Sequence, residues 1–194
     1  MNALLLNNTY AFLAYVCILK EKKTILSWIM TILDNEPVKR VEKILKNFDS
    51  NLKVILLNSS ARTALEAASS LNCEVGAIVK SLLFKTEDTF TLCLIAGDRK
   101  ASLNKIKKIL NIKDALMATA DEVKNITGFT IGGVSPIGHL NKVNIYIDNS
   151  LERFEVLYAA AGHPNCVFRI DYTKLEKITN GLIKDISEWD NQDY

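Results

Sequence analysis

Hydrophobic residues along the chain follow two different periods. Where they recur every three or four positions, with lysine, arginine and glutamate between them, the pattern predicts helices. These segments are residues 38–48, 63–71, 102–110, 119–126 and 171–178. Short runs rich in β-branched and aromatic residues predict strands. They are residues 53–57, 75–85, 89–96, 143–147, 156–160 and 166–170.

The order of these elements indicates the fold class. Helices and strands do not alternate strictly, and Thr-Glu-Asp at 86–88 separates two neighbouring strand runs, which is a hairpin signal. The sequence therefore predicts an α/β (α+β-like) fold. Its sheet is expected to be mixed and largely antiparallel, a curved sheet or barrel flanked by helices.

Polar residues before the helical segments predict where the helices begin. Thr119 precedes Glu122 by three residues, which is the spacing of a capping box. Ser102 is a plausible N-cap for the segment that follows it, and Ser59 or Ser60 for the alanine-rich segment at 63–71.

The first 36 residues differ from the rest of the chain. Apolar runs at 10–19 and 24–33 flank a Lys-Glu-Lys-Lys sequence, and each is shorter than the ~20 residues of a membrane span. Three interpretations stay open: an extra helix packed on the domain, a membrane-associating element, or an upstream stretch from a wrong start, with Met30 as the natural start. The expected organisation is an extension at 1–36, a domain at 37–184 and an acidic tail at 185–194.

Charge and cysteine usage exclude several classes of function. The 194-residue chain has a net charge of +2, too small for a protein that coats a nucleic-acid backbone, so DNA is not an expected partner. A protein that grips only the end of a nucleic acid remains compatible. The cysteines fit no zinc pattern, and Cys93 and Cys166 lie in apolar runs, where a reduced cysteine behaves as a small core residue. We therefore expect no metal and a reducing, cytoplasmic location. The four cysteines are Cys17, Cys73, Cys93 and Cys166. The tail from Asp185 has four acids and no base, which predicts a solvated or frayed segment.

Glycine, proline and histidine are scarce, yet they gather in two windows. The larger window contains Gly132, Gly133, Pro136 and His139, and the smaller contains Gly162 and His163. Glycines let a ligand approach main-chain amides, which can bind a phosphate or an oxyanion; the alternative is a tight turn between strands. The window is neither a P-loop nor a dinucleotide fingerprint.

Two residue types in these windows could do chemistry. Ser135 misses the nucleophile-elbow spacing, and Pro136 after it has no N–H for an oxyanion hole, which argues against a serine hydrolase. His163 ends a run of small residues; it could donate to a ligand or shuttle a proton, or equally be a turn histidine bonded to the backbone.

Lys80 lies inside an apolar strand run, where a buried lone cation would be costly. It is either a lysine on the wet face or an ammonium aimed at an anionic ligand, and alternation alone does not decide between them.

Together these residues resemble a known family. Lys80 in GAIVKSLLF, the Gly132-x-x-x-Pro136 loop in GFTIGGVSPIGH, and AAGHPN followed by VFRI occur in the order found in YbaK-like aminoacyl-tRNA deacylases. That family is related to the inserted editing domain of bacterial prolyl-tRNA synthetase. The resemblance extends from about residue 37 to 180, and without synthetase segments the protein resembles a freestanding member.

The resemblance implies a trans-editing hydrolase that removes a wrong amino acid from the 3′ end of a tRNA, commonly proline tRNA. It implies that Lys80 contacts the terminal adenosine end, and that Gly132, Gly133, Val134, Ser135 and Pro136 hold the ester and position water. A ribose hydroxyl of the substrate can assist, so no cofactor or metal is expected.

His139, Gly162 and His163 are secondary substrate-binding candidates. Prolyl-tRNA synthetase is a candidate partner; a membrane, left open for the first 36 residues, is not the expected one. The alternative function is a non-catalytic module that binds an aminoacyl or nucleotide end and docks on a synthetase.

Overall fold

The structure is a computed structural model that describes residues 22–58, 61–87 and 89–190. The chain divides into two compact units, one ending at Asn35 and the other beginning at Glu36. Within the described part of the first unit, residues 22–33 are helical. No helix of the described residues combines the length and the apolar character that crossing a membrane requires. The apolar run at 10–19, Cys17, Ser59 and Ser60 lie outside the described residues.

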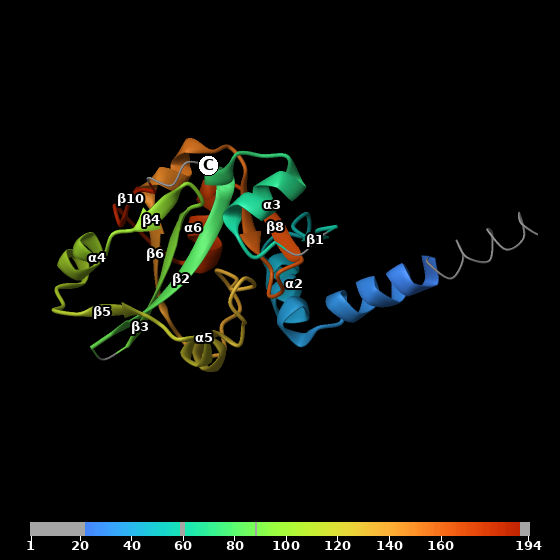
Figure 1. Ribbon diagram of the computed structural model, residues 1–194, viewed down its shortest axis with the longest axis horizontal. Helices are drawn as coiled ribbons and strands as arrows, with labels where there is room; N and C mark the ends of the chain where they lie inside the picture. The colour runs from blue at the N-terminus through green and yellow to red at the C-terminus, as the bar shows by residue number, and fades with distance from the viewer. Residues whose placement is uncertain (1–21, 59–60, 88, 191–194) are drawn as a thin grey trace, which may run out of the picture. The chain divides into compact units, whose positions relative to one another are not determined.

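A mixed sheet forms the centre of the second unit (Figure 1). Its strand order is β1 (Val54–Leu56), β8 (Cys166–Ile170), β7 (Leu157–Ala160), β2 (Ile78–Thr86), β3 (Phe90–Ala96), β6 (Asn144–Asp148) and β9 (Leu182–Lys184), with β5 (Ala115–Met117) also paired to β2. The β1–β8, β7–β8, β2–β3 and β2–β5 pairs are antiparallel, and the β2–β7, β3–β6 and β6–β9 pairs are parallel. The expected mixed, largely antiparallel sheet is confirmed. Because β1 and β9 are edges of the described sheet, it is an open sheet and not a closed barrel.

Helices flank this sheet at the positions that the hydrophobic period predicts. They are α2 (Glu36–Phe48), α3 (Ala64–Leu71), α4 (Leu103–Leu110), α5 (Ala120–Thr127) and α6 (Tyr172–Thr179). The capping box before α5 is confirmed, because the Thr119 side chain accepts from the N–H of Glu122 and the Glu122 carboxylate accepts from the N–H of Thr119.

The predicted cap of α3 is wrong. The N-cap is Thr63 rather than Ser59 or Ser60, because Thr63 and Glu66 form a second capping box. Ser102 does stand at the N-cap of α4, but its side chain makes no capping bond. Its hydroxyl donates instead to Oε2 of Glu188, 3.2 Å away.

The acidic tail is more ordered than the sequence indicated. Ser187–Trp189 form β10, which pairs antiparallel with β4 (Arg99–Ala101) in a second sheet. The N–H of Ser102 also donates to the main-chain oxygen of Ile186. Main-chain pairing therefore fixes the described start of the tail, so β10 is not frayed, although Glu188 and Trp189 are exposed to solvent. The part of the chain that the structure describes also contains two 3-10 turns, η1 (Val75–Ala77) and η2 (Asn149–Arg153).

One face of β2 borders two apolar clusters. Ile78 packs with Ala67 and Ala68 of α3, whereas Phe84 packs with Ile106 of α4. Since alternate residues of a strand share a face, Lys80 lies on this same face between the two clusters. The fold therefore places a cation between two parts of the core.

Candidate functional site

The second unit contains a cavity of about 360 Å³ at an edge of β2. Along this edge, β2 pairs with β7 only at Ile78 and Val79, and with β5 only from Phe84 to Thr86. Residues 80–83 between these two pairings line the cavity. The cavity thus lies along the part of β2 between the end of its pairing with β7 and the start of its pairing with β5.

The cavity wall is largely apolar. Side chains from α3, β2, β5, α5, β7 and β8 contribute to it, together with the loop after α5. Its apolar lining residues include Ala61, Ala64, Ala67, Leu83, Met117, Val123, Ile131, Val134, Pro164 and Val167. Such a wall suits a small apolar group, and the few polar groups at it would fix the orientation of a ligand.

The loop at 130–136 contributes to the cavity wall, and its two glycines are needed for different reasons. The N–H of Gly133 donates to the main-chain oxygen of Thr130, and Gly132 has a φ of +88°, as the third residue of a type II turn requires. Gly133 instead lies against the β7–β8 turn, where an added Cβ would be 3.0 Å from Cα and N of His163. Gly132 and Val134 line the cavity.

The second window forms the β7–β8 turn beside this loop. The N–H of Ala161 donates to the main-chain oxygen of Cys166. The main-chain oxygen of Pro164 accepts from the N–H of Ala61. Pro164 reaches the cavity and lies beside Gly132, where a Cβ would be 3.6 Å from its ring. The two windows predicted from composition are therefore adjacent in space.

His163 takes part in the turn. Its Nδ1 accepts from the N–H of Asn165 at 3.1 Å, which assigns the ring proton of the neutral imidazole to Nε2. Burial lowers the pKa of His163 and so favours this neutral form. Its Nε2–H is the remaining donor of the ring, although His163 does not line the cavity itself.

The cavity lining does not include Ser135, Pro136 or His139. Ser135 is fully buried and its Oγ accepts from the N–H of Ile137 at 3.4 Å. His139 donates from Nε2 to the main-chain oxygen of Ser135 at 2.8 Å and packs its ring edge to face with Phe129. Burial lowers the pKa of His139, in keeping with a neutral ring. These contacts hold the shape of the loop.

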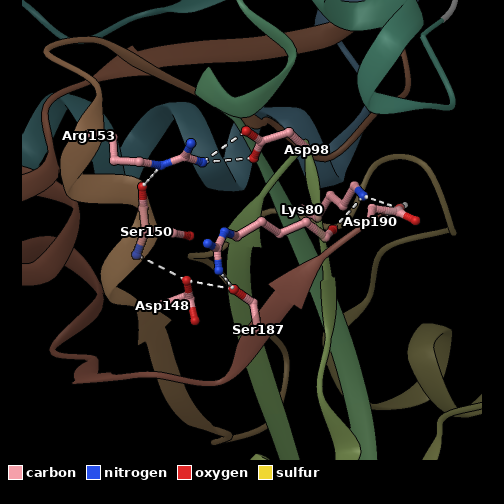
Figure 2. Close-up of polar contacts among 8 residues, drawn as sticks. Lys80, Asp98, Asp148, Ser150, Arg153, Ser187 and Asp190 are labelled. Atoms are coloured by element: carbon pink, nitrogen blue, oxygen red, sulfur yellow. Dashed lines mark hydrogen bonds and ion pairs between the residues drawn. The ribbon is translucent and has the colours of Figure 1, made fainter. Parts of the chain in front are cut away.

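Lys80 is half-buried, and its side chain is 23% exposed. Its Nζ donates to the main-chain oxygen of Arg99 at 2.8 Å and lies 3.7 Å from Oδ2 of Asp190 (Figure 2). Burial lowers the pKa of the Lys80 amine, while Asp190 and Asp98 act to raise it. Lys80 is thus neither on an open wet face nor buried without partners, and it is part of the cavity wall.

Several lining residues had no signal in the sequence. Arg62 and Thr63 reach the site because the segment before α3 is tied to the β7–β8 turn, and Met117 because β5 pairs with β2. Ser81 has a buried Oγ without a hydrogen-bond partner among the described residues. The described residues contain no group of three or more potential metal ligands.

The sequence of this region identifies the family. Residues 58–178 match the model of the aminoacyl-tRNA editing domain. The chain belongs to this family. The matched range contains Lys80, both glycine windows and all the residues that line the cavity. The resemblance drawn from the sequence motifs is confirmed at this level.

Relatives of this editing domain occur alone and within larger proteins. The uncharacterized protein YwhH of Bacillus subtilis (strain 168) is 33% identical over 122 residues, which are 62% of this chain and 77% of YwhH. A proline--tRNA ligase of Caldicellulosiruptor saccharolyticus is 29% identical over 118 residues, 61% of this chain but 19% of the ligase. A crystal structure described as a candidate trans-editing enzyme for prolyl tRNA synthetase has a TM-score of 0.75 at 36% identity, covering 79% of this chain and 98% of that one.

Proposed function

We propose that the protein is a trans-editing deacylase that hydrolyses the ester of a mischarged tRNA, in particular a misacylated proline tRNA. The observation that carries the proposal is the apolar cavity whose lining includes both Lys80 and the Gly132 turn. A cavity of this kind supports a substrate with two parts: an anionic nucleotide end and a small aminoacyl group.

In this proposal Lys80 binds the anionic end of the tRNA, and the cavity encloses the amino-acid side chain. An aminoacyl ester is already activated, so correct positioning of the ester and water supplies much of the rate. The N–H of Gly133 is engaged by Thr130, so the ligand-facing main-chain groups of the loop are assigned to Gly132 and Val134. Exclusion of the correct, larger amino acid by the wall would provide specificity.

His163 and His139 have secondary roles in the proposal. The Nε2–H of His163 is assigned to orienting a ligand oxygen or water, through the turn that also contains Gly162. His139, Ser135 and Pro136 support the loop. The proposed location is the cytoplasm, where the mischarged 3′ end is the partner and prolyl-tRNA synthetase the companion enzyme.

A second candidate is a module that binds an aminoacyl or nucleotide end without turnover and docks on a synthetase. The wall is compatible with both candidates, because burial raises the pKa of Cys166 to about 12 and the proposed deacylation uses positioned water rather than a cysteine nucleophile. The thiol therefore stays protonated near neutral pH.

The deciding experiment measures release of labelled amino acid from alanyl-, cysteinyl- and seryl-tRNA of the proline isoacceptor. We expect Lys80→Ala to lower kcat/KM by roughly 10- to 100-fold, about 1.4–2.8 kcal/mol, because an ionic contact to the substrate is removed. Lys43→Ala, at an exposed position of α2, is the matched control. Tight binding of the panel without any release of amino acid would reject the deacylase and support the binding module.

A further inference from the structure

The described residues after α6 lie outside the range that matches the family model, which ends at residue 178. The chain nevertheless returns through β9 and β10 to the β4 side of the site. It ends, in the described part, at Asp190, whose N–H donates to the main-chain oxygen of Asp98 at 3.4 Å. A carboxylate from the C-terminal segment thereby comes to lie beside Lys80 (Figure 2).

A fully buried carboxylate anchors the start of this segment. Oδ2 of Asp148 accepts from the N–H of Ile186 at 2.8 Å, and Oδ1 accepts from Oγ of Ser187 at 2.8 Å and from the N–H of Ser150 at 3.0 Å. Asp148 ends β6, inside the core of the domain. The path of the segment is therefore set by hydrogen bonds to a fixed interior group.

Trp189 fixes the end of the segment. The guanidinium carbon of Arg99 lies 4.3 Å from the centre of the Trp189 ring, and that of Arg153 lies 5.2 Å from it. Arg153 also donates to both carboxylate oxygens of Asp98, at 2.8 and 2.9 Å. The charge of Asp98 is thus offset by its own partner, whereas Asp190 faces Lys80.

The donors of Lys80 can be assigned one by one. An ammonium has three N–H groups. One is used by the main-chain oxygen of Arg99, and a second faces Asp190. The third has no acceptor among the described residues, and Lys80 lines the cavity. One hydrogen-bonded acceptor and one carboxylate oxygen 3.7 Å away therefore leave at least one N–H of Lys80 for a ligand.

We propose that Asp190 is a positioning residue, which keeps the Lys80 ammonium charged and orients its remaining N–H toward the anionic end of the substrate. The effect of Asp190 on catalysis rests on the function proposed above. The contact between Asp190 and Lys80 does not depend on that function. It assigns a role in the site to a segment that the family match does not include.

The charged groups around Lys80 make the electrostatic direction clear. Asp190 from the C-terminal segment and Asp98 from the β3–β4 turn raise the pKa of the amine, against the larger effect of burial, which lowers it. Arg153 offsets Asp98, and the guanidinium of Arg99 is directed to Ser187. Without the charge of Asp190, the lowering of the Lys80 pKa by burial is opposed less strongly. The amine therefore loses its proton at a lower pH.

The first test measures the ionisation of Lys80 itself, in the full chain without substrate. Titration of Lys80 by NMR of its side-chain carbon and nitrogen, assigned with Lys80→Arg, is compared between wild type and Asp190→Asn. We expect a lower pKa of Lys80 in Asp190→Asn, restoration in Asp190→Glu, and no change in Asp185→Asn, whose carboxylate pairs with Lys105 on the surface. An unchanged pKa in Asp190→Asn would overturn the proposal, even if that variant were less stable.

The second test measures deacylation against pH, after subtracting spontaneous ester hydrolysis. The contribution of the charged Lys80 to activity is complete below its pKa and is lost as the pH rises through that pKa. Asp190→Asn should therefore move the alkaline limb of kcat/KM to lower pH. A uniform loss of activity at every pH, without movement of the limb, would contradict positioning. If the wild type releases no amino acid, the proposed function fails, and the titration still decides the role of Asp190.

Discussion

Replacing Asp148 by asparagine tests whether one buried carboxylate fixes the C-terminal segment. Asp148 is 0% exposed and accepts three hydrogen bonds, from the main-chain N–H groups of Ser150 and Ile186 and from the hydroxyl of Ser187. Asparagine has nearly the same shape but one acceptor oxygen and an NH₂ group in place of the other. In either orientation of the amide, the NH₂ group would face a main-chain N–H.

The magnitude follows from the bonds that remain. With the amide oxygen toward Ser150 and Ser187, the N–H of Ile186 loses its acceptor and remains buried against a donor. Loss of a hydrogen bond to a charged group is worth about 1.5–3 kcal/mol, and an unpaired buried donor costs about 1–3 kcal/mol. Because these contributions overlap, we expect the free energy of unfolding to fall by about 2–4 kcal/mol. For a chain of this size, that corresponds to a decrease in Tm of about 4–16 °C.

Urea unfolding of the wild type, Asp148→Asn and Asp185→Asn provides the assay. Asp185 pairs with Lys105 across the surface, and exposed pairs of this kind contribute about 1 kcal/mol or less. If Asp148→Asn destabilises the protein no more than Asp185→Asn does, the segment is not fixed through Asp148, and the reasoning is refuted.

Three further outcomes are expected. Gly133→Ala should lower the free energy of unfolding by about 1–3 kcal/mol in urea titrations, because the new Cβ would meet main-chain atoms of the β7–β8 turn at 3.0 Å; a neutral effect would show that the turn can yield. Thr119→Ala should cost about 1 kcal/mol by removing the cap of α5, measured in the same way, and a loss below 0.3 kcal/mol, roughly the spread of such measurements, would contradict it. Burial raises the pKa of Cys93 and of Cys166 to about 12, so at pH 8 their thiols stay protonated and iodoacetamide should alkylate them after Cys73, with peptide mass spectrometry as the readout; early labelling of Cys93 would contradict its burial.

The parts of the fold that depend on local sequence could be predicted. The β2–β3 hairpin and the capping box of α5 were predicted because their signals lie within a few residues of each other. The cap of α3 was missed although Thr63 and Glu66 have the same spacing, since serines a few positions earlier offered a competing signal. Local chemistry thus predicts element types well and exact ends less well.

Short strands were missed because their stability comes from the partner strand. β4, β5, β9 and β10 have three residues each, too few for a period to be recognised. Leu116 and Met117 of β5 are exposed, so hydrophobic patterning does not distinguish them from a loop. The β10 segment contains Glu188 and appeared to be part of a charged tail. Pairing between distant segments is a property of the fold, and a single sequence does not display it.

In the candidate site, too, features set by local residue type could be predicted, and features set by the pairing of distant segments could not. The glycine windows could be predicted, because a positive φ at Gly132 and a close approach at Gly133 both leave a mark on residue type. The cavity itself could not, since it arises where β7 leaves β2 before β5 begins, and that depends on the register of three strands. The contact of Lys80 with Asp190 joins residues 110 positions apart through a segment that is anchored elsewhere. A lysine in an apolar strand therefore indicates that a partner must exist, and only the fold identifies it.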